Sequence, residues 1–156
     1  MDLGNESVTI FTSADDGRVI GLYVPATFGD FSRYMPHDGA RAYVTDATLP
    51  LQLAVLTGPK GSLSDAHIHD PLPQIPWPTR HTAIVCISGS VRVFLSDRHG
   101  LAVAAPVLSI GDTLLFTEGH QLELLEEQTR IIEVKQGPYP GSQDADRRRL
   151  TISGEK

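Results

Sequence analysis

The stretch HTAIVCISGSVRVFLSD, residues 81–97, indicates the class of fold. Its second half alternates, because Val91, Val93 and Leu95 occupy every other position. A period of two residues is typical of a β-strand with one buried face. Its first half is apolar at consecutive positions over residues 83–87, which is typical of a strand that is covered on both faces. The stretch therefore predicts two consecutive strands with different surroundings.

Two later stretches alternate in the same way. The first, HQLELLEE, puts its histidine and two of its leucines on one face (His120, Leu122 and Leu124). The second, RIIEVKQ, pairs Ile132 with Val134, and we expect its Glu and Lys to turn outward. Turn residues separate such runs at near-regular intervals along the chain. This pattern predicts an all-β fold, a sandwich or a barrel.

Composition limits the expected partners and location. The 156 residues carry a net charge of −6 and no long basic stripe, so neither nucleic acid nor an anionic membrane is expected to bind. Cys86 is the single cysteine, so no intramolecular disulfide can form. The first ten residues lack the basic and apolar regions of a signal peptide, and no apolar run approaches the ~20 residues of a membrane helix. We therefore expect a cytoplasmic protein.

Two histidines separated by one residue are the strongest chemical signal. In an extended strand, residues i and i+2 point to the same face, so the imidazoles of His67 and His69 emerge side by side. Neighbouring imidazoles fit two adjacent positions on one metal ion. An isolated pair of this kind is also typical of a β-protein surface, so its interpretation depends on the context.

The spacing around these histidines resembles the two-motif signature of the cupin superfamily. GSLSDAHIH, residues 61–69, matches the opening of the first motif, G-x5-H-x-H. GDTLLFTEGH, residues 111–120, is similar to the second motif, G-x5-P-x-G-x2-H-x3-N, with Thr117 in place of the proline. The resemblance covers about residues 52–136, which is most of the chain.

This resemblance implies a fold and a metal site. Cupins are small antiparallel β-barrels, of the double-stranded β-helix or jelly-roll type, and their motif histidines hold a metal inside the barrel. We expect one cupin domain over residues 1–156. Its expected parts are N-terminal strands in residues 1–50, the barrel in residues 51–136 and a C-terminal tail in residues 137–156. By resemblance, His67, His69 and His120 are the predicted metal ligands.

Both motifs are degenerate, and the acidic ligand of the first is missing. Counting forward from His69 places Gln74 at the position of this acidic ligand. Counting back from Gly89 places Thr82 at that position instead. His120 stands two residues before the position of the histidine in the second motif. A shift of two residues keeps a side chain on the same face of a strand. Three-histidine iron sites and His-only zinc sites are known among cupins, so the resemblance implies iron, zinc or nickel. Gln74 and His81 are the candidates for a fourth ligand.

The segment DPLPQIPWPTR, residues 70–80, is expected to form the rim of a pocket. Its four prolines stiffen the loop, and Trp77 supplies a large flat apolar surface. We expect Trp77, Leu72 and Ile75 to line a pocket for an apolar or aromatic substrate. Arg80 is a candidate for binding a substrate carboxylate or phosphate. In the alternative interpretation, Trp77 seals the end of the barrel and Arg80 is an ordinary surface residue.

Three functions remain open at this point. The leading hypothesis is a metal-dependent enzyme acting on a small oxygenated molecule, by Lewis-acid cyclisation, isomerisation or dehydration, or by O₂-dependent dioxygenase chemistry. The second is a metal-independent isomerase or epimerase of the sugar-nucleotide type, with a histidine as general base. The third is a cupin that binds a ligand without converting it. A homodimer would cover the second face of residues 83–87, and residues 1–50 of the same chain would do so equally well.

Overall fold

The alternating stretches form strands. The computed structural model describes residues 7–30, 40–61, 66–67, 69, 77–137, 141–142 and 148–154. Among these residues none is helical, so no membrane-crossing helix occurs in the described part of the chain. The strands are β1 (Thr9–Thr12), β2 (Val19–Val24), β3 (Ala40–Tyr43), β4 (Ala54–Thr57), β5 (Thr82–Ser88), β6 (Val91–Ser96), β7 (Ala102–Ala104), β8 (Val107–Leu108), β9 (Thr113–Phe116), β10 (Gly119–Leu124) and β11 (Arg130–Lys135).

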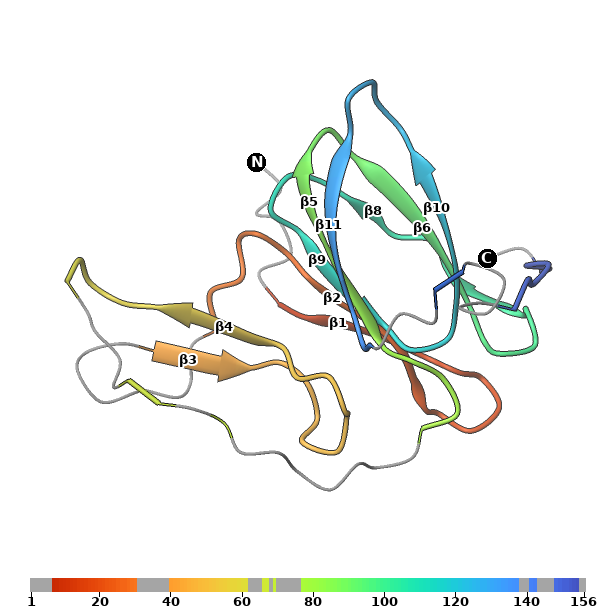
Figure 1. The fold of residues 1–156 in the computed structure, drawn as a ribbon, viewed down its shortest axis with the longest axis horizontal. Helices are drawn as coiled ribbons and strands as arrows, with labels where there is room; N and C mark the ends of the chain where they lie inside the picture. The colour runs from red at the N-terminus through yellow and green to blue at the C-terminus, as the bar shows by residue number, and fades with distance from the viewer. Residues whose placement is uncertain are drawn as a thin grey trace.

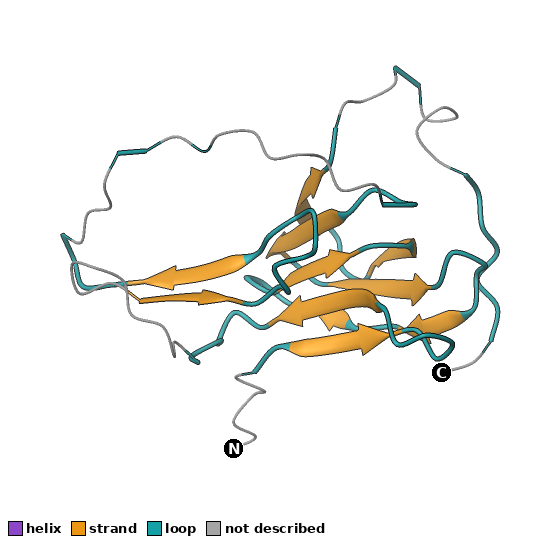
Figure 2. Ribbon diagram, turned by 90° about the horizontal axis from the view of Figure 1, so that it is seen from below, coloured by secondary structure: helices purple, strands orange, loops and turns teal. Residues whose placement is uncertain are grey.

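These strands form two larger antiparallel sheets and one separate pair (Figures 1 and 2). The first sheet has the order β1-β2-β9-β5-β11, the second has the order β10-β6-β7 with β8 also paired to β6, and β3 pairs with β4. Within the described strands, β10 and β11 follow one another in sequence but are not paired, so the two sheets do not close into a barrel. The all-β prediction is confirmed.

The main core lies between the two larger sheets. Val91, Val93 and Leu95 of β6 are fully buried, as their alternation predicts. They pack in one cluster with residues of β5 and β9, including Ile84 and Phe116. Burying one such side chain stabilises the fold by roughly 1.5–3 kcal/mol. The β6 sequence therefore fixes which face of the second sheet points inward.

A second cluster covers the other face of the first sheet. Ala83 and Leu115 are buried there, on the face opposite to Ile84. Their cover includes Val44 and Val55, from the segments on either side of the turn between β3 and β4. The consecutive apolar run of β5 therefore has cover on both faces from within the chain, and part of that cover comes from the first 50 residues.

The facing of β11 differs from the prediction. Glu133 lies opposite Ile84, which belongs to the main core, so Glu133 and Lys135 lie on the inner face of the sheet. Ile132 and Val134 lie on the outer face, where they are 50% and 52% exposed. The expected outward turn of Glu133 and Lys135 is wrong. β11 is the last strand of its sheet, and its inner face remains open enough to water for charged side chains.

The described end of the C-terminal tail lies along the second sheet. The Ala102 N–H donates to the Ser153 carbonyl at 3.0 Å, and the Ser153 N–H donates to the Gly100 carbonyl at 2.9 Å. Gly100 has a φ of +92°, and a Cβ at this position would collide with the carbonyl oxygen of Thr151. A glycine is therefore required where the tail approaches the turn after β6.

Candidate functional site

The inward-facing residues of β10 are exposed to solvent. Antiparallel pairing places His120 opposite Leu95 and Leu122 opposite Val93, so these β10 side chains share the core face of β6. The β6 residues are completely buried, whereas Leu122 is 37% exposed and Leu124 is 57% exposed. His120 is exposed as well. The face of the second sheet that is buried on β6 is therefore open to solvent on β10, the edge strand of that sheet.

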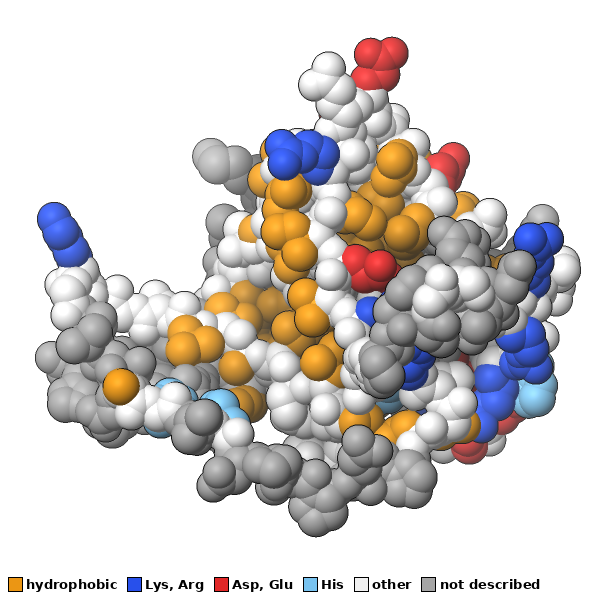
Figure 3. All heavy atoms as spheres, in the orientation of Figure 1, with side chains coloured by type: hydrophobic (Ala, Val, Ile, Leu, Met, Phe, Trp, Pro, Cys, Tyr) orange, Lys and Arg blue, Asp and Glu red, His pale blue; other side chains and the backbone are white. Residues whose placement is uncertain are grey.

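The inner face of β11 lies across from this uncovered face. β10 and β11 meet at their hairpin and diverge away from it (Figure 1). Figure 3 shows hydrophobic side chains in a hollow between the two strands, with acidic atoms beside it. We call this hollow the β10–β11 groove. Its walls are His120, Leu122 and Leu124 of β10 and Ile131, Glu133 and Lys135 of β11.

His120 holds a defined position at the start of the groove. Its ring lies on Phe116, with 4.2 Å between ring centroids and 40° between planes. Its Nδ1 lies 3.3 Å from the Glu118 carbonyl oxygen. A carbonyl oxygen can only accept a hydrogen bond, so this contact places the proton of a neutral ring on Nδ1 and the lone pair on Nε2. In that tautomer Nε2 can accept a proton from a ligand.

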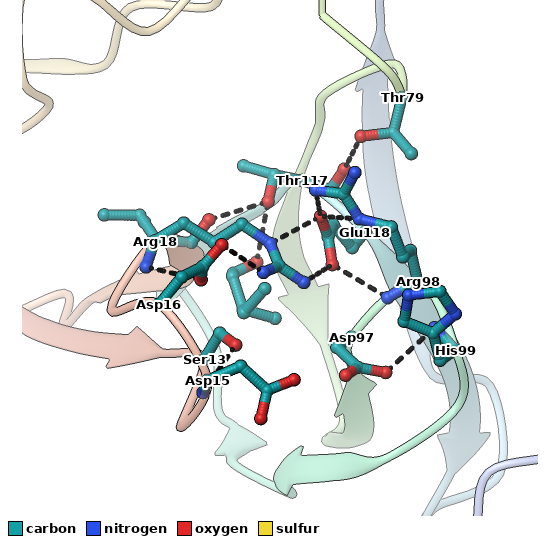
Figure 4. Close-up of polar contacts among 12 residues, drawn as sticks. Ser13, Asp15, Asp16, Arg18, Thr79, Asp97, Arg98, His99, Thr117 and Glu118 are labelled. Carbon is teal, nitrogen blue, oxygen red and sulfur yellow. Dashed lines mark hydrogen bonds and ion pairs between the residues drawn. The ribbon is translucent and has the colours of Figure 1, made fainter.

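An ion cluster around the buried Glu118 carboxylate holds the turn before His120 (Figure 4). The Glu118 side chain is 3% exposed and accepts hydrogen bonds from Arg18 Nε at 2.9 Å and Arg98 Nη2 at 2.7 Å. The Arg98 backbone N–H donates to the same carboxylate at 2.8 Å. Burial alone raises the pKa of Glu118, but the hydrogen bonds from Arg18 and Arg98 outweigh it, so the pKa lies below its ordinary value. The cluster joins the loops before β2, β7 and β10.

His67 and His69 lie next to each other, as predicted, although neither described residue belongs to a strand. Their ring centroids are 5.0 Å apart, with an edge-to-face angle of 88°, and both residues are exposed. The described pieces of their segment lie apart from β10 in Figure 1. Two imidazoles at this separation can contact one ion.

The third predicted ligand is not part of this pair. His120 lies on the second sheet, with its ring on Phe116. No group of three His, Cys, Asp or Glu side chains in the described residues lies close enough together to hold a metal ion. These residues alone do not fit the three-imidazole centre that the resemblance implies. The centre therefore stays a prediction.

His81, a candidate fourth ligand, lies on a different part of the first sheet. It immediately precedes β5, and alternation places it on the face opposite to the buried Thr82. Its side chain is completely buried, and neither ring nitrogen has a hydrogen-bond partner among the described residues. Burial lowers the pKa of His81. The ring is therefore a neutral imidazole in an apolar setting at neutral pH.

The predicted rim segment packs on the ends of β9 and β11. The Trp77 ring lies 5.1 Å from the His81 ring at 68°, and Trp77 is 36% exposed. The Thr79 hydroxyl donates to the Thr117 carbonyl at 2.5 Å. Arg80 Nη1 lies 3.4 Å from the Gln136 carbonyl oxygen. Trp77 therefore covers a buried histidine, and the other predicted site residues, Leu72, Gln74 and Ile75, lie outside the described residues.

Several groove residues were missed from the sequence. Glu133 and Lys135 were expected to face outward, and Phe116 was not singled out as the support of His120. The alternation of β11 was the available signal, but it does not say which of two faces is inner.

Comparison of the chain with protein-family models, with curated protein sequences and with solved structures finds no match.

Proposed function

We propose that the chain binds a small organic molecule in the β10–β11 groove and uses His120 as an acid–base group without a metal. One observation carries this proposal: the core face of β6 continues onto β10, where Leu122 and Leu124 are exposed instead of buried. An uncovered apolar surface beside a few polar groups is typical of a ligand site. We further propose that the open sandwich is a variant of the cupin jelly roll.

The groove chemistry favours an apolar or aromatic molecule that carries oxygen atoms. Leu122, Leu124 and Ile131 offer aliphatic surface to its body. His120 Nε2 can accept a proton in the tautomer set by Glu118, and the Glu133 side chain lies on the opposite wall. A base that takes a proton from one atom of the bound molecule and returns it to another suits the proton transfers of an isomerisation.

Variants on the two faces of β10 test the groove. We expect Leu122→Glu to weaken binding of the aromatic dye 8-anilinonaphthalene-1-sulfonate at least tenfold, about 1.4 kcal/mol, because the bound dye would have to cover the new carboxylate. Dye fluorescence titration measures the affinity.

In a panel of aromatic hydroxy and keto compounds, His120→Gln is expected to retain binding and to lower turnover by roughly 10²–10⁴.

Gln121→Glu is the matched control, because it adds the same charge one residue earlier, on the opposite face of β10. Equal loss of dye binding in Gln121→Glu and Leu122→Glu would contradict a groove on the inner face. If wild-type protein binds members of the panel and converts none of them, the chain is a binding module and the acid–base role of His120 is rejected.

A metal-dependent enzyme is a second candidate, favoured by the 5.0 Å separation of the His67 and His69 rings. It would have an iron, zinc or nickel ion on these histidines and on ligands beyond them. Metal analysis of protein purified without an affinity tag distinguishes the two candidates. The second requires about one equivalent of metal per chain, and less than about a tenth of an equivalent rejects it.

A further inference from the structure

We propose that the β10 edge of the second sheet binds an extended peptide segment of a partner protein, apolar at alternate positions and basic between them, as an added antiparallel strand. This inference goes beyond the proposed function, although it rests on the same uncovered face of β10. Within the described strands β10 pairs only with β6, so it forms the edge of its sheet (Figure 1). An edge strand presents backbone donors and acceptors along one side and is a template for another strand.

Backbone direction identifies the residues that bond across this edge. The Leu125 N–H donates to the carbonyl of the residue before β6, at 3.0 Å. Successive residues of a strand point their backbone groups to opposite sides, so those of Leu122 and Leu124 point away from β6. The register agrees, because Val93 lies opposite Leu122 and its N–H donates away from β10, to the Pro106 carbonyl at 2.9 Å.

The same two leucines carry the apolar side chains of the groove wall. Leu122 and Leu124 are both exposed, on the face that is buried on β6. In an antiparallel pair, two residues that exchange both backbone hydrogen bonds lie directly opposite each other, with their side chains on one face. A residue bonded to Leu122 or Leu124 therefore points its own side chain into the groove. This geometry predicts apolar residues at alternate positions of the added strand.

Charge favours a basic peptide over a second copy of this chain. From the start of β10 to the end of β11 the sequence has four glutamates and two basic residues, in a chain of net charge −6. Glu123 lies between the two leucines on the other face of β10, where it pairs with Arg92 and remains 48% exposed. A basic residue between two apolar ones of the added strand would lie beside Glu123. A second copy would instead bring two acidic hairpins together, and like charges across an interface oppose binding.

The test is the binding of a fluorescein-labelled heptapeptide to the full chain, measured by fluorescence anisotropy. The peptide alternates valine and lysine, with valine at both ends. Methylation of the backbone nitrogens of its two internal valines is expected to lower the affinity by about tenfold or more, because these N–H groups bond to β10. Methylation of two lysine backbone nitrogens is the matched control, with an expected change of about threefold or less. A peptide with glutamate in place of lysine is expected to bind about tenfold more weakly.

Amide hydrogen exchange, followed by NMR, locates the bound peptide. In the free protein we expect the amides of Gln121 and Glu123 to be protected by β6, and those of Leu122 and Leu124 to exchange faster. Saturating peptide is expected to slow the exchange of the two leucine amides by about tenfold or more. Leu122→Lys is expected to weaken peptide binding by about tenfold or more. Gln121→Lys is its control, because it adds the same charge on the opposite face, and circular dichroism checks that both variants are folded.

Wild-type protein that does not bind the valine–lysine peptide overturns the proposal. So do equal effects of the two methylations, equal effects of Leu122→Lys and Gln121→Lys, and leucine amides that the peptide leaves unprotected. Equal affinity for the glutamate peptide overturns the basic partner, and a dimer of the chain that Leu122→Lys abolishes overturns the peptide as the occupant. Binding of the dye and of panel compounds without the peptide rejects this inference alone, whereas binding of the peptide without any small molecule rejects the proposed function alone.

Discussion

Glu118→Gln is expected to destabilise the fold by about 2–3 kcal/mol, because it leaves two guanidinium groups beside a nearly buried amide. The Glu118 side chain is 3% exposed, and those of Arg18 and Arg98 are 21% and 34% exposed. Partial exposure of the arginines moderates the loss. For a chain of this length, the midpoint of thermal unfolding should fall by roughly 4–12 °C, as measured by circular dichroism.

Glu123→Gln is the control for this prediction. Glu123 pairs with Arg92 at 2.7 Å, and their side chains are 48% and 39% exposed. Breaking an exposed pair costs at most about 1 kcal/mol. Equal losses of stability in Glu118→Gln and Glu123→Gln would contradict the view that the Glu118 cluster holds the loops together.

The same cluster is expected to make the stability of the fold depend on pH, with a loss of stability in acid. The pKa of Glu118 is lowered in the folded protein relative to its ordinary value of 4.5. A group with a lowered folded pKa stabilises the protein above its unfolded pKa, and this contribution is lost as pH falls through the folded pKa. The difference in unfolding free energy between wild type and Glu118→Gln should therefore narrow as the pH falls below about 4.5.

Local patterns in the sequence predicted the parts of the fold that depend on neighbouring residues. Alternation identified the buried face of β6, and it also placed His120 on the inner face of β10, despite its early position in the motif. It placed the rings of His67 and His69 side by side. The features of β6 and β10 need only the period of two residues that a strand imposes, whereas the described His67 and His69 lie close together outside any strand.

Features that depend on distant residues were not predictable in this way. Arg18 and Glu118 are 100 positions apart in the chain, and no local pattern pairs them. The facing of β11 was misjudged because an apolar pair usually marks the buried side, whereas Ile132 and Val134 lie on the outer face of an edge strand. Convergence of His120 with the His67–His69 pair also depends on how loops fold, and spacing along the chain does not determine that.

His81→Met is expected to make the protein more resistant to mild acid than the wild type. The imidazole of His81 is buried with neither ring nitrogen partnered among the described residues, so an apolar side chain of similar size removes a desolvation cost without removing a hydrogen bond. At pH 8 we expect the unfolding free energies of the two proteins to differ by at most about 1.5 kcal/mol.

The difference is expected to grow as the solution is acidified. Burial lowers the pKa of His81 from its ordinary value of 6.5, so below pH 6.5 the unfolded wild type binds a proton that the folded state does not. Wild-type stability then falls by up to about 1.4 kcal/mol for each pH unit, until the folded pKa is reached. His81→Met lacks this loss, so its advantage should increase between pH 7 and pH 5.

Urea unfolding at several pH values measures this effect. In the wild type and in His81→Met the signal is the emission of Trp77, which is the single tryptophan of the chain and lies against His81. His99→Met is the control, because His99 is exposed. It measures how the loss of an imidazole that is not buried changes the unfolding free energy. An advantage of His81→Met that is the same at pH 8 and pH 5 would show that the ring is not held neutral by burial. A loss of stability at pH 8 well above about 1.5 kcal/mol would exceed the cost of the change in side-chain shape and would indicate instead that the ring nitrogens bind a partner.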